Sequence, residues 1–330
     1  MIAGRMLRRL SQGALLLASS VLGASSNAEA QSLPSSNGIR IVAPAPPGTP
    51  PDVSSRIMAT ELAESEGWRV VVENKPGAGG ALAATSVLLQ PADGTTILMI
   101  TQPDTVTPAL MGKMPFRLDT DFAPLIKVSV GYNVLVVHPS VPARSVSELV
   151  ALLKSQPDKF NFSSGGFGTP AHLLGELFKL RTGVRATHVP YQGQQRMADF
   201  LSGATHFSFY NTAAVVDLIA TGKLRALAVT APQRIAVLKD LPTMAEQGFP
   251  ALVVEGWDGF AVKNGTSNDI VARMNESMNK VLTRHKIRVA FANGGSEPAG
   301  GTPAEFGNLI RSEIARWGEV VKDSGIRMPQ

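Results

Sequence analysis

Cysteine is absent from this sequence of 330 residues, and several other signatures of chemistry are absent with it. Without a thiol the chain has no disulfide, no thiolate metal site and no cysteine nucleophile. It contains no Gly-x-Ser-x-Gly elbow, no dinucleotide fingerprint and no P-loop lysine, so neither serine hydrolysis nor nucleotide binding is indicated. The 5 histidines show no metal-ligand spacing. The sequence therefore predicts a protein that is not an enzyme and that needs no metal or cofactor.

Charge is also sparse. Charged residues make up 17% of the chain and hydrophobic residues 44%, which is typical of a folded globular protein. The net charge of +5 includes Arg5, Arg8 and Arg9 near the N-terminus. No run of lysine and arginine alternates with aromatic residues, so we expect no nucleic-acid partner. The length of 330 residues allows two lobes, each with its own core.

The apolar run 14–24 is too short for a membrane span, which requires ~20 residues, and serines interrupt it. It follows the basic residues and precedes Ala28-Glu29-Ala30, a small-x-small cleavage pattern. Residues 1–30 are therefore predicted to be a signal peptide that is cleaved near Ala30, with a membrane anchor as the alternative. The expected location is the periplasm. Arg8-Arg9 leaves open whether export follows the general or the twin-arginine route.

One glycine-rich segment organises the second half of the chain. Residues 161–178 read as a short strand, a loop of glycines and hydroxyl residues, and a helix with apolar positions at helical spacing. Thr169 is a suitable N-cap and Pro170 a suitable first helical residue. Glycines let main-chain N–H groups point at one spot, where the helix dipole favours an anion. The segment is therefore either a cradle for a carboxylate or phosphate, or a strand-to-helix turn without a ligand.

The first half of the chain begins with the same order of strand, loop and helix. Residues 39–43 form a predicted strand that leads into the proline-rich loop 44–52, and a helix follows from about Val53. Prolines set the backbone in advance and so lower the ordering cost of ligand capture. The loop is therefore interpreted as a binding loop, although a stiff surface connection has the same composition.

The next segment repeats this design. Residues 68–80 give a strand and a glycine turn, in which Gly79 and Gly80 either offer N–H donors to an anion or allow tight packing. An alanine-rich helix follows, and then a strand over 95–101. Alternating strands and helices predict an α/β fold with a largely parallel sheet, whose carboxyl edge faces the ligand. The last strand delivers two polar residues to that edge, Thr101 and Gln102.

The order of short motifs along the chain resembles the Bug family, the periplasmic substrate-binding receptors of tripartite tricarboxylate transporters. The motifs run through essentially the whole mature chain: Pro46-Pro47-Gly48, Val72 to Gly80, Asp93-Gly94, Val136 to Pro139, Val189 to Gly193, Gly222 to Thr230, Leu241-Pro242-Thr243 and Glu246-Gln247-Gly248.

This resemblance implies a type II periplasmic-binding-protein fold, in which two α/β lobes joined by two crossing strands close on a ligand. The predicted division is a signal peptide over 1–30, a discontinuous first lobe over 31–136 and 254–330, and a second lobe over 137–253. The apolar segment 132–138 suits the first crossing and 253–262 the second. Helices over 268–283, 285–293 and 303–324 are expected to cover the first lobe.

The resemblance further implies that main-chain amides, hydroxyls and ordered waters hold a ligand carboxylate, without an arginine clamp. Its binding loops map onto Ala45, Pro46, Pro47, Gly48 and Thr49 in the first lobe and onto Ser164, Gly166, Gly168, Thr169, His172, Tyr191 and Gly193 in the second. With Gly79, Gly80, Thr101, Gln102, Tyr210 and Asn211, these residues form the candidate site.

Three departures from the family pattern bear on the ligand. Thr49 replaces a glycine, the segment Gln194-Gln195-Arg196-Met197 replaces small residues, and Tyr210 stands before Asn211 where many members carry an aspartate. An aspartate there would compensate a ligand ammonium, because a buried cation must be paired. Tyrosine instead offers an aromatic face and a hydroxyl. We hypothesise a carboxylate ligand without an amino group, either aromatic or dicarboxylic; the alternative is that Tyr210 packs in the core.

The function implied is capture of a small organic acid by a monomeric receptor and its delivery to a membrane permease. A sensor component for a histidine kinase would have the same fold and stays open as an alternative. A secreted enzyme on the same scaffold is the third reading, because fold alone does not determine function. Against that reading, no nucleophile–base pair or carboxylate pair falls in the predicted cleft loops.

Overall fold

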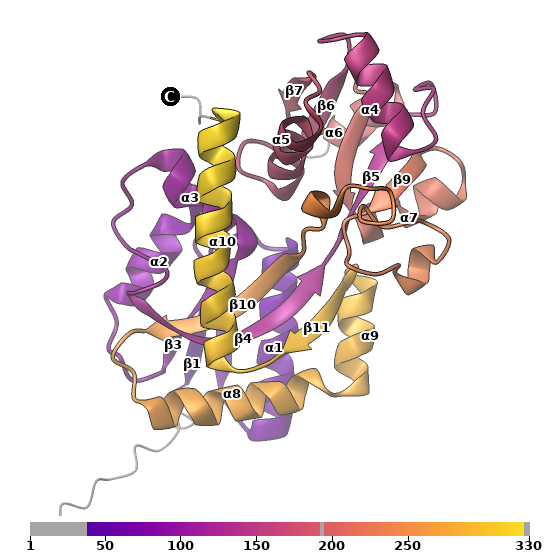
Figure 1. The fold of residues 1–330 in the computed structure, drawn as a ribbon. Coiled ribbons are helices and arrows are strands. Elements are labelled where there is room, and N and C mark those ends of the chain that lie inside the picture. The colour runs from indigo at the N-terminus through magenta and orange to yellow at the C-terminus, as the bar shows by residue number, and fades with distance from the viewer. Residues whose placement is uncertain (1–37, 192–194, 327–330) are drawn as a thin grey trace, which may run out of the picture. The chain divides into compact units, whose positions relative to one another are not determined.

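The computed structural model describes residues 38–191 and 195–326. The predicted signal peptide and the predicted ligand residue Gly193 lie outside these ranges. Within them the chain forms two β-sheets, each covered by helices (Figure 1). None of the helices described is both long and apolar enough to cross a bilayer.

The first sheet has the strand order β11-β4-β10-β3-β1-β2. β1 pairs in parallel with β2 and β3, whereas β10 lies antiparallel between β3 and β4 and β11 pairs antiparallel with β4. The predicted parallel arrangement therefore holds for the N-terminal strands, and β10 runs against them because it returns from the second sheet. The strands are β1 (Ile39–Ala43), β2 (Val70–Asn74), β3 (Thr96–Thr101), β4 (Phe122–Gly131), β10 (Gly256–Lys263) and β11 (Ser296–Gly300).

The second sheet has the order β7-β6-β8-β5-β9. β6 pairs in parallel with β7 and β8, and β5 is antiparallel to both β8 and β9. Thus each sheet contains one strand, β10 or β5, that enters from the other sheet and lies antiparallel to both of its neighbours. The strands are β5 (Asn133–Val137), β6 (Asn161–Ser164), β7 (Thr187–Pro190), β8 (Phe207–Asn211) and β9 (Arg225–Val229).

Helices pack on both faces of each sheet. They are α1 (Pro50–Glu66), α2 (Ala81–Leu88), α3 (Gln102–Met111), α4 (Val146–Ser155), α5 (Pro170–Thr182), α6 (Gln195–Leu201), α7 (Thr212–Ala220), α8 (Asn268–Leu282), α9 (His285–Asn293) and α10 (Pro303–Ser324), with 3-10 turns η2 (Ala78–Gly80), η3 (Ala236–Leu238) and η4 (Pro250–Leu252).

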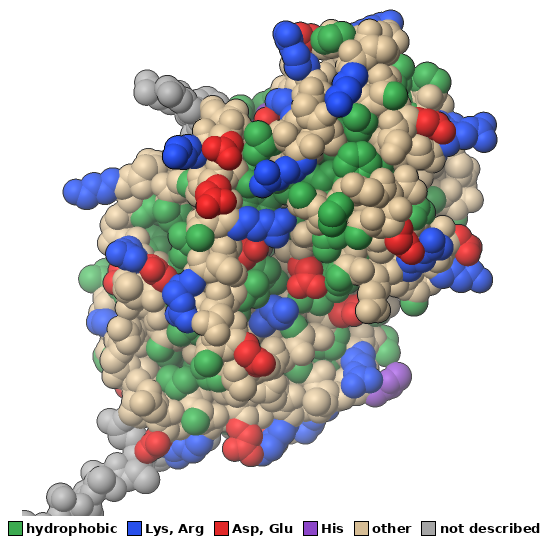
Figure 2. Space-filling view, in the orientation of Figure 1, with side chains coloured by type: hydrophobic (Ala, Val, Ile, Leu, Met, Phe, Trp, Pro, Cys, Tyr) green, Lys and Arg blue, Asp and Glu red, His purple; other side chains and the backbone are tan. Residues whose placement is uncertain are grey.

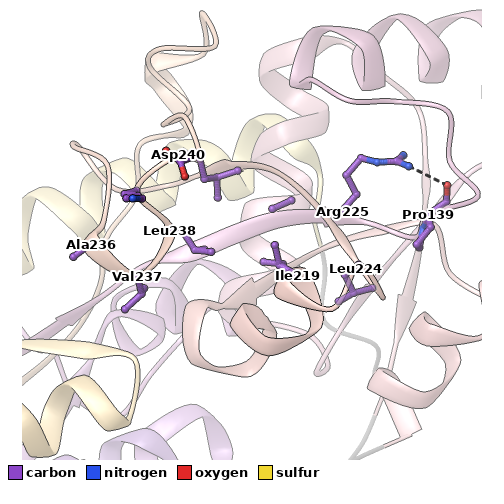
Figure 3. Close-up of a pocket in the computed structure, with 12 residues that line it drawn as sticks. Pro139, Ile219, Leu224, Arg225, Ala236, Val237, Leu238 and Asp240 are labelled. Atoms are coloured by element: carbon purple, nitrogen blue, oxygen red, sulfur yellow. Dashed lines mark hydrogen bonds between the residues drawn. The ribbon is translucent and has the colours of Figure 1, made fainter.

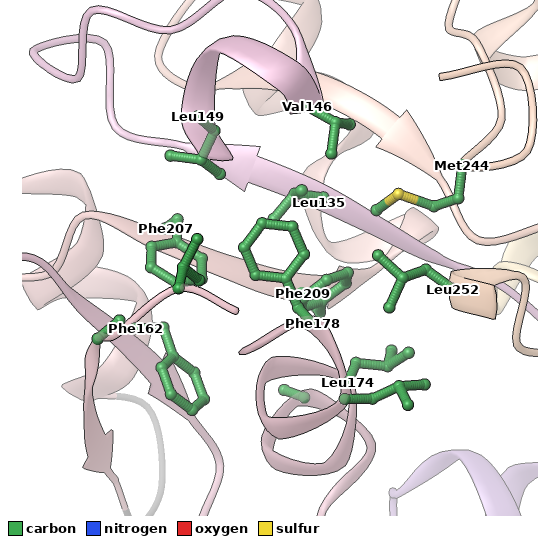
Figure 4. Close-up of a cluster of buried hydrophobic side chains, with 14 of the residues drawn as sticks. Leu135, Val146, Leu149, Phe162, Leu174, Phe178, Phe207, Phe209, Met244 and Leu252 are labelled. Atoms are coloured by element: carbon green, nitrogen blue, oxygen red, sulfur yellow. The ribbon is translucent and has the colours of Figure 1, made fainter. Parts of the chain in front are cut away.

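Side-chain alternation divides each sheet between two cores. In β3, Ile97 and Met99 join the cluster with α1, α8 and α9, whereas Leu98 and Ile100 join the cluster with α2 and the start of α10. This two-residue period is what a strand buried on both faces requires. In the second sheet, phenylalanines of β6 and β8 pack against Leu174 and Phe178 of α5 (Figure 4).

The C-terminal helix α10 reaches both cores. Phe306 and Ile310, in its first half, pack on the first sheet, as predicted. Trp317, Val320 and Val321, in its second half, belong to the core of the second sheet, beside α5. The prediction that this helix covers the first lobe was therefore incomplete. A helix of 22 residues is about 33 Å long and extends beyond a single sheet.

The chain passes between the sheets twice, at Tyr132 between β4 and β5 and over 230–255 between β9 and β10. The predicted lobe boundaries, at 136/137 and 253/254, remain a proposal. On the face drawn in Figure 2, basic and acidic side chains are interspersed, and ion pairs such as Lys127–Glu255 and Arg316–Glu313 are consistent with that mixing.

Candidate functional site

The first predicted binding loop, between β1 and α1, is held in its conformation by hydrogen bonds to Asp52. Its buried carboxylate accepts from the N–H of Gly48 (2.8 Å), from Asn74 Nδ2 (2.8 Å) and from Arg56 Nε (3.0 Å). Burial tends to raise the pKa of Asp52, but the hydrogen bonds from Arg56, Gly48 and Asn74 outweigh it and lower that pKa. The predicted donor Gly48 is therefore already paired, and Asp52 holds the loop in shape.

The other predicted first-lobe residues adjoin this loop. Asn74 Nδ2 also donates to the carbonyl of Ala45 (2.9 Å), and the Thr49 hydroxyl donates to the carbonyl of Pro46 (2.6 Å). A Cβ on Gly80 would lie 3.7 Å from Pro44 and 2.6 Å from Asp104 Oδ1. The ends of β1, β2 and β3 thus meet at one edge, as the predicted topology requires. Pro47 is exposed, and a Cβ on Gly79 would collide with Thr107 at 2.5 Å.

Thr101 and Gln102 lie where predicted, at the end of β3 and the start of α3. The N–H and hydroxyl of Thr101 both donate to Asp104 Oδ2. Gln102 is 2% exposed, and its Nε2 has no hydrogen-bond partner among the described residues. It lines a pocket of about 10 Å³ together with residues of the second half of the chain, among them Pro170 and Leu173 of α5. Gln102 therefore lies where the two halves of the fold approach each other.

The glycine-rich loop between β6 and α5 is held by its own hydroxyl groups. Ser164 Oγ accepts from the N–H of Gly166 (3.1 Å) and donates to its carbonyl (3.0 Å), and the Thr169 hydroxyl donates to the same carbonyl (2.7 Å). The N–H of Tyr191 donates to the carbonyl of Ser164 (3.0 Å), so the ends of β6 and β7 are adjacent. A Cβ on Gly168 would lie 3.4 Å from Leu110 of α3. The loop thus approaches the first half of the chain.

The side chain of His172 is buried and forms a hydrogen bond with this loop. It is 2% exposed, its Nδ1 accepts from the N–H of Gly168 (3.1 Å), and its ring stacks on His188 at a centroid distance of 4.2 Å. His188 Nε2 lies 2.7 Å from Ser164 Oγ. Desolvation and nearby cations lower the pKa of His172 to about 4 and that of His188 to about 3, so both rings are neutral at pH 7. His188 was missed by the sequence analysis, because nothing in its flanking residues indicates the stacked pair.

The helices that begin at the predicted loops have unused N–H groups in their first turns. α1, α2 and α5 carry no side-chain cap, and α1 and α5 begin with proline; α3 and α9 likewise have no hydrogen bond to the N-cap side chain. In α4, α7, α8 and α10, by contrast, the N-cap side chain accepts a main-chain hydrogen bond. A helix start without a cap retains donors and a positive dipole end for an anion.

Tyr210 and Asn211 lie at the end of β8. Tyr210 is 6% exposed and packs in the core against Phe200, with Arg196 over its ring at 3.8 Å. The packing alternative for Tyr210 therefore describes this structure, and the ring offers no free face to a ligand. Asn211 caps α7, with Oδ1 accepting from the N–H of Ala213 (3.0 Å), and lies against Gly131 and Gly295 near the first crossing.

A pocket of about 680 Å³ lies away from these loops. It is lined by α7, β9 and the turn η3, with Ile219, Leu224 and Val237 among its apolar residues (Figure 3). None of the predicted site residues lines it. Arg225, on its wall, donates to main-chain carbonyls, including that of Pro139 (3.5 Å), so this arginine has a structural role.

Two buried carboxyl groups behind the first-lobe loops lead to a prediction about pH. Desolvation raises the pKa of Asp104 and of Asp258 to about 6, although Thr101 donates to the first and Ser54 and Ser129 donate to the second. Because the folded pKa exceeds the unfolded value, the folded state binds more protons between about pH 4 and 6. Stability is therefore lost as the pH rises through this window, by at most about 3 kcal/mol for Asp258.

The variant Asp258→Asn removes this titration while keeping an oxygen that accepts from Ser54. We expect Tm to fall less between pH 5 and pH 8 in the variant than in the wild type, as measured by thermal denaturation at both values. The charge of Asp258 also helps to raise the pKa of Asp104, so the difference reports Asp258 together with its coupling to Asp104. An equal change in the two proteins would show that this carboxyl is not titrating in the folded state.

Two α/β sheets that exchange crossing strands, with uncapped helix starts at the ends of their parallel strands, define the class of two-lobed solute-binding proteins. Comparison with known proteins agrees. The model of the tripartite tricarboxylate transporter family receptors, TctC, matches residues 53–326. The chain belongs to this family, which includes the Bug receptors. It is therefore a receptor and not an enzyme, and the family supports a periplasmic location.

Individual relatives cover nearly the whole chain. Protein BugT of Bordetella pertussis is 35% identical over 293 residues, which are 88% of this chain and 90% of BugT. Among solved structures, Rpa4515 of R. palustris with adipate has 33% identity and a TM-score of 0.75, covering 88% of this chain and 98% of its own. MatC of Rhodopseudomonas palustris with bound malate has 28% identity and a TM-score of 0.73, covering 86% and 98%.

Proposed function

We propose that this receptor captures a small organic carboxylate between its two lobes and delivers it to a membrane permease. The observation that carries the proposal is the uncapped start of α5, whose first residue, Pro170, lines a small pocket together with Gln102 of α3. The uncapped start of α2 provides a second set of donors in the other lobe, and α1, which begins with two prolines that have no N–H, adds the positive end of its dipole. Donors of this kind suit a carboxylate and need no cationic side chain.

The relatives with bound adipate and malate support this ligand class. The proposed contacts are the loop residues 45–49, Gly79, Gly80, Thr101 and Gln102 on one side, and Ser164, Gly166, Gly168, Thr169, His172, Tyr191, Gly193 and Asn211 on the other. Because Tyr210 replaces an acid, the ligand has no amino group.

We further propose that residues 1–30 direct export and are removed near Ala30, and that the mature protein works as a monomer.

We expect the two lobes to close on the ligand because the closed state makes contacts with it that the open state lacks. A ligand shifts a two-state equilibrium only as far as it binds one state better than the other. A carboxylate that bridges the starts of α2 and α5 makes both sets of contacts only when the lobes are closed. The closed form would then be the form that the permease recognises.

A thermal-shift screen of the mature chain against organic acids tests the proposal. A ligand at 100 times its Kd stabilises the folded state by about 2.7 kcal/mol, so the expected rise in Tm is about 5 °C. The panel should hold adipate, malate and aromatic acids, with aspartate and glutamate as amino-acid controls. If no acid raised Tm, capture of a carboxylate would be refuted; if aspartate or glutamate bound best by calorimetric titration, the assignment of Tyr210 would be wrong.

A further inference from the structure

Arg196, in the first turn of α6, lies beside the proposed site. Its Nη2 donates to the carbonyls of Ser163 (3.3 Å) and Phe209 (2.8 Å) and to Ser208 Oγ (2.6 Å), which belong to β6 and β8. Ser163 immediately precedes the loop residue Ser164. The guanidinium is therefore held against β6 and β8, next to the residue that precedes the glycine-rich loop and over the ring of Tyr210.

The acceptors of Arg196 account for only part of its donors. A guanidinium has five N–H donors. Nη2 carries two of them and is occupied, whereas buried Nε has no partner and Nη1 makes no hydrogen bond within 38–191 and 195–326. Arg196 thus keeps N–H donors for which no described residue is an acceptor.

The charge of Arg196 is likewise not balanced by an acid. No described carboxylate forms a salt bridge with it, and the nearest acid along its own helix, Asp199, accepts from Gln195 Nε2 at 2.6 Å. Its neutral neighbours are main-chain carbonyls and the Tyr210 ring, over which it lies at 3.8 Å. Burial accordingly lowers the pKa of Arg196. A partly buried cation of this kind is stabilised when an anion joins it.

We propose that Arg196 binds a second anionic group of the ligand, so that the receptor selects dicarboxylates over monocarboxylates of the same length. This inference rests on the proposed function, because α5 would hold the first carboxylate. The Tyr210 ring lies against the guanidinium, and Ser208 and Phe209 fix its position. Two departures from the family pattern therefore act together: Tyr210 supplies no acid to pair with an ammonium, and it supports Arg196, which pairs with an anion.

The test compares Arg196→Gln with the wild type by calorimetric titration. The probes are dicarboxylates of four to six carbons, succinate, glutarate and adipate, each beside its monocarboxylate of equal length. We expect the variant to lose about 10- to 100-fold in affinity for the dicarboxylate, the range expected for one charge-assisted hydrogen bond. Affinity for the monocarboxylate should change less than about 3-fold, since it makes no contact with Arg196.

Arg225→Gln is the matched control. Arg225 also donates to main-chain carbonyls of the second half of the chain, those of Val141 (2.9 Å) and Ala143 (3.2 Å), but it lies by the pocket of Figure 3. Equal losses in both variants, or equal losses for both classes of acid, would overturn the proposal. So would wild-type protein that prefers monocarboxylates, a result that leaves carboxylate capture intact. A wild type that binds no acid would overturn the proposed function as well.

Discussion

Replacing Thr169 by aspartate should abolish carboxylate capture while leaving the fold intact. Thr169 is the N-cap of α5, and its side chain makes no capping hydrogen bond. Aspartate is among the best N-cap residues, so Thr169→Asp should stabilise the helix slightly. Its charge would occupy the place proposed for the ligand carboxylate, and two like charges about 4 Å apart repel by about 4 kcal/mol at an effective dielectric constant of 20. Affinity should fall about 100- to 1000-fold.

Thr169→Asn is the control, because asparagine has the same shape and caps equally well without a charge. Its affinity for an acid that binds the wild type should stay within a few-fold, as measured by calorimetry. Tm without ligand should change little in both variants, because the cap that is gained offsets the loss of the hydrogen bond from the Thr169 hydroxyl to the Gly166 carbonyl. Full binding by the aspartate variant would show that the ligand does not approach the start of α5.

Replacing Trp317 by alanine should lower the free energy of unfolding by about 3–5 kcal/mol, the largest loss of stability among the variants proposed for this protein. The side chain is fully buried in the core of the second sheet, although it belongs to a helix that begins on the first. Its Nε1 donates to Glu313 Oε2 (2.8 Å), which is itself buried. The change therefore leaves a cavity and an unpaired carboxylate oxygen. Urea denaturation measures the loss.

Trp317→Phe separates the two contributions, since it retains most of the ring volume and loses only the donor. It should cost about 1–2 kcal/mol. Trp68→Ala serves as a reference, because Trp68 is similarly buried but belongs to the first core alone. A Trp317→Ala protein that lost less than the phenylalanine variant would contradict the packing described for α10.

The sequence predicted the parts of the fold whose signals are local. The strands at 39–43 and 161–164, the N-cap Thr169 with Pro170, and the helices at 285–293 and 303–324 all lie where they were expected. The edge strand β11 was missed because it contains a proline and ends in a glycine, and its pairing with β4 is a tertiary property. α3 was missed because Pro103 and Pro108 interrupt its pattern.

The candidate site could be predicted from the sequence only in part, for a different reason. Sequence patterns identified the loops but assigned their N–H groups to the ligand, whereas Gly48, Gly166 and Gly168 donate to side chains within the loops. Those side chains, Asp52 and His172 among them, lie several residues away, so only the folded geometry shows which donors remain. Arg196 carried a signal in the sequence, since it departs from the family pattern, but its contact with Tyr210 joins positions 14 residues apart.

The path of α10 has a mechanical consequence. Because one continuous helix is anchored in the first core by Phe306 and in the second by Trp317, the halves cannot move apart along its axis without withdrawing a large aromatic ring from its packing. Rotation about an axis close to Trp317 preserves both anchors. Release of solute should therefore proceed through a modest swing with a fixed pivot, and the angle reached is limited by how far α10 bends.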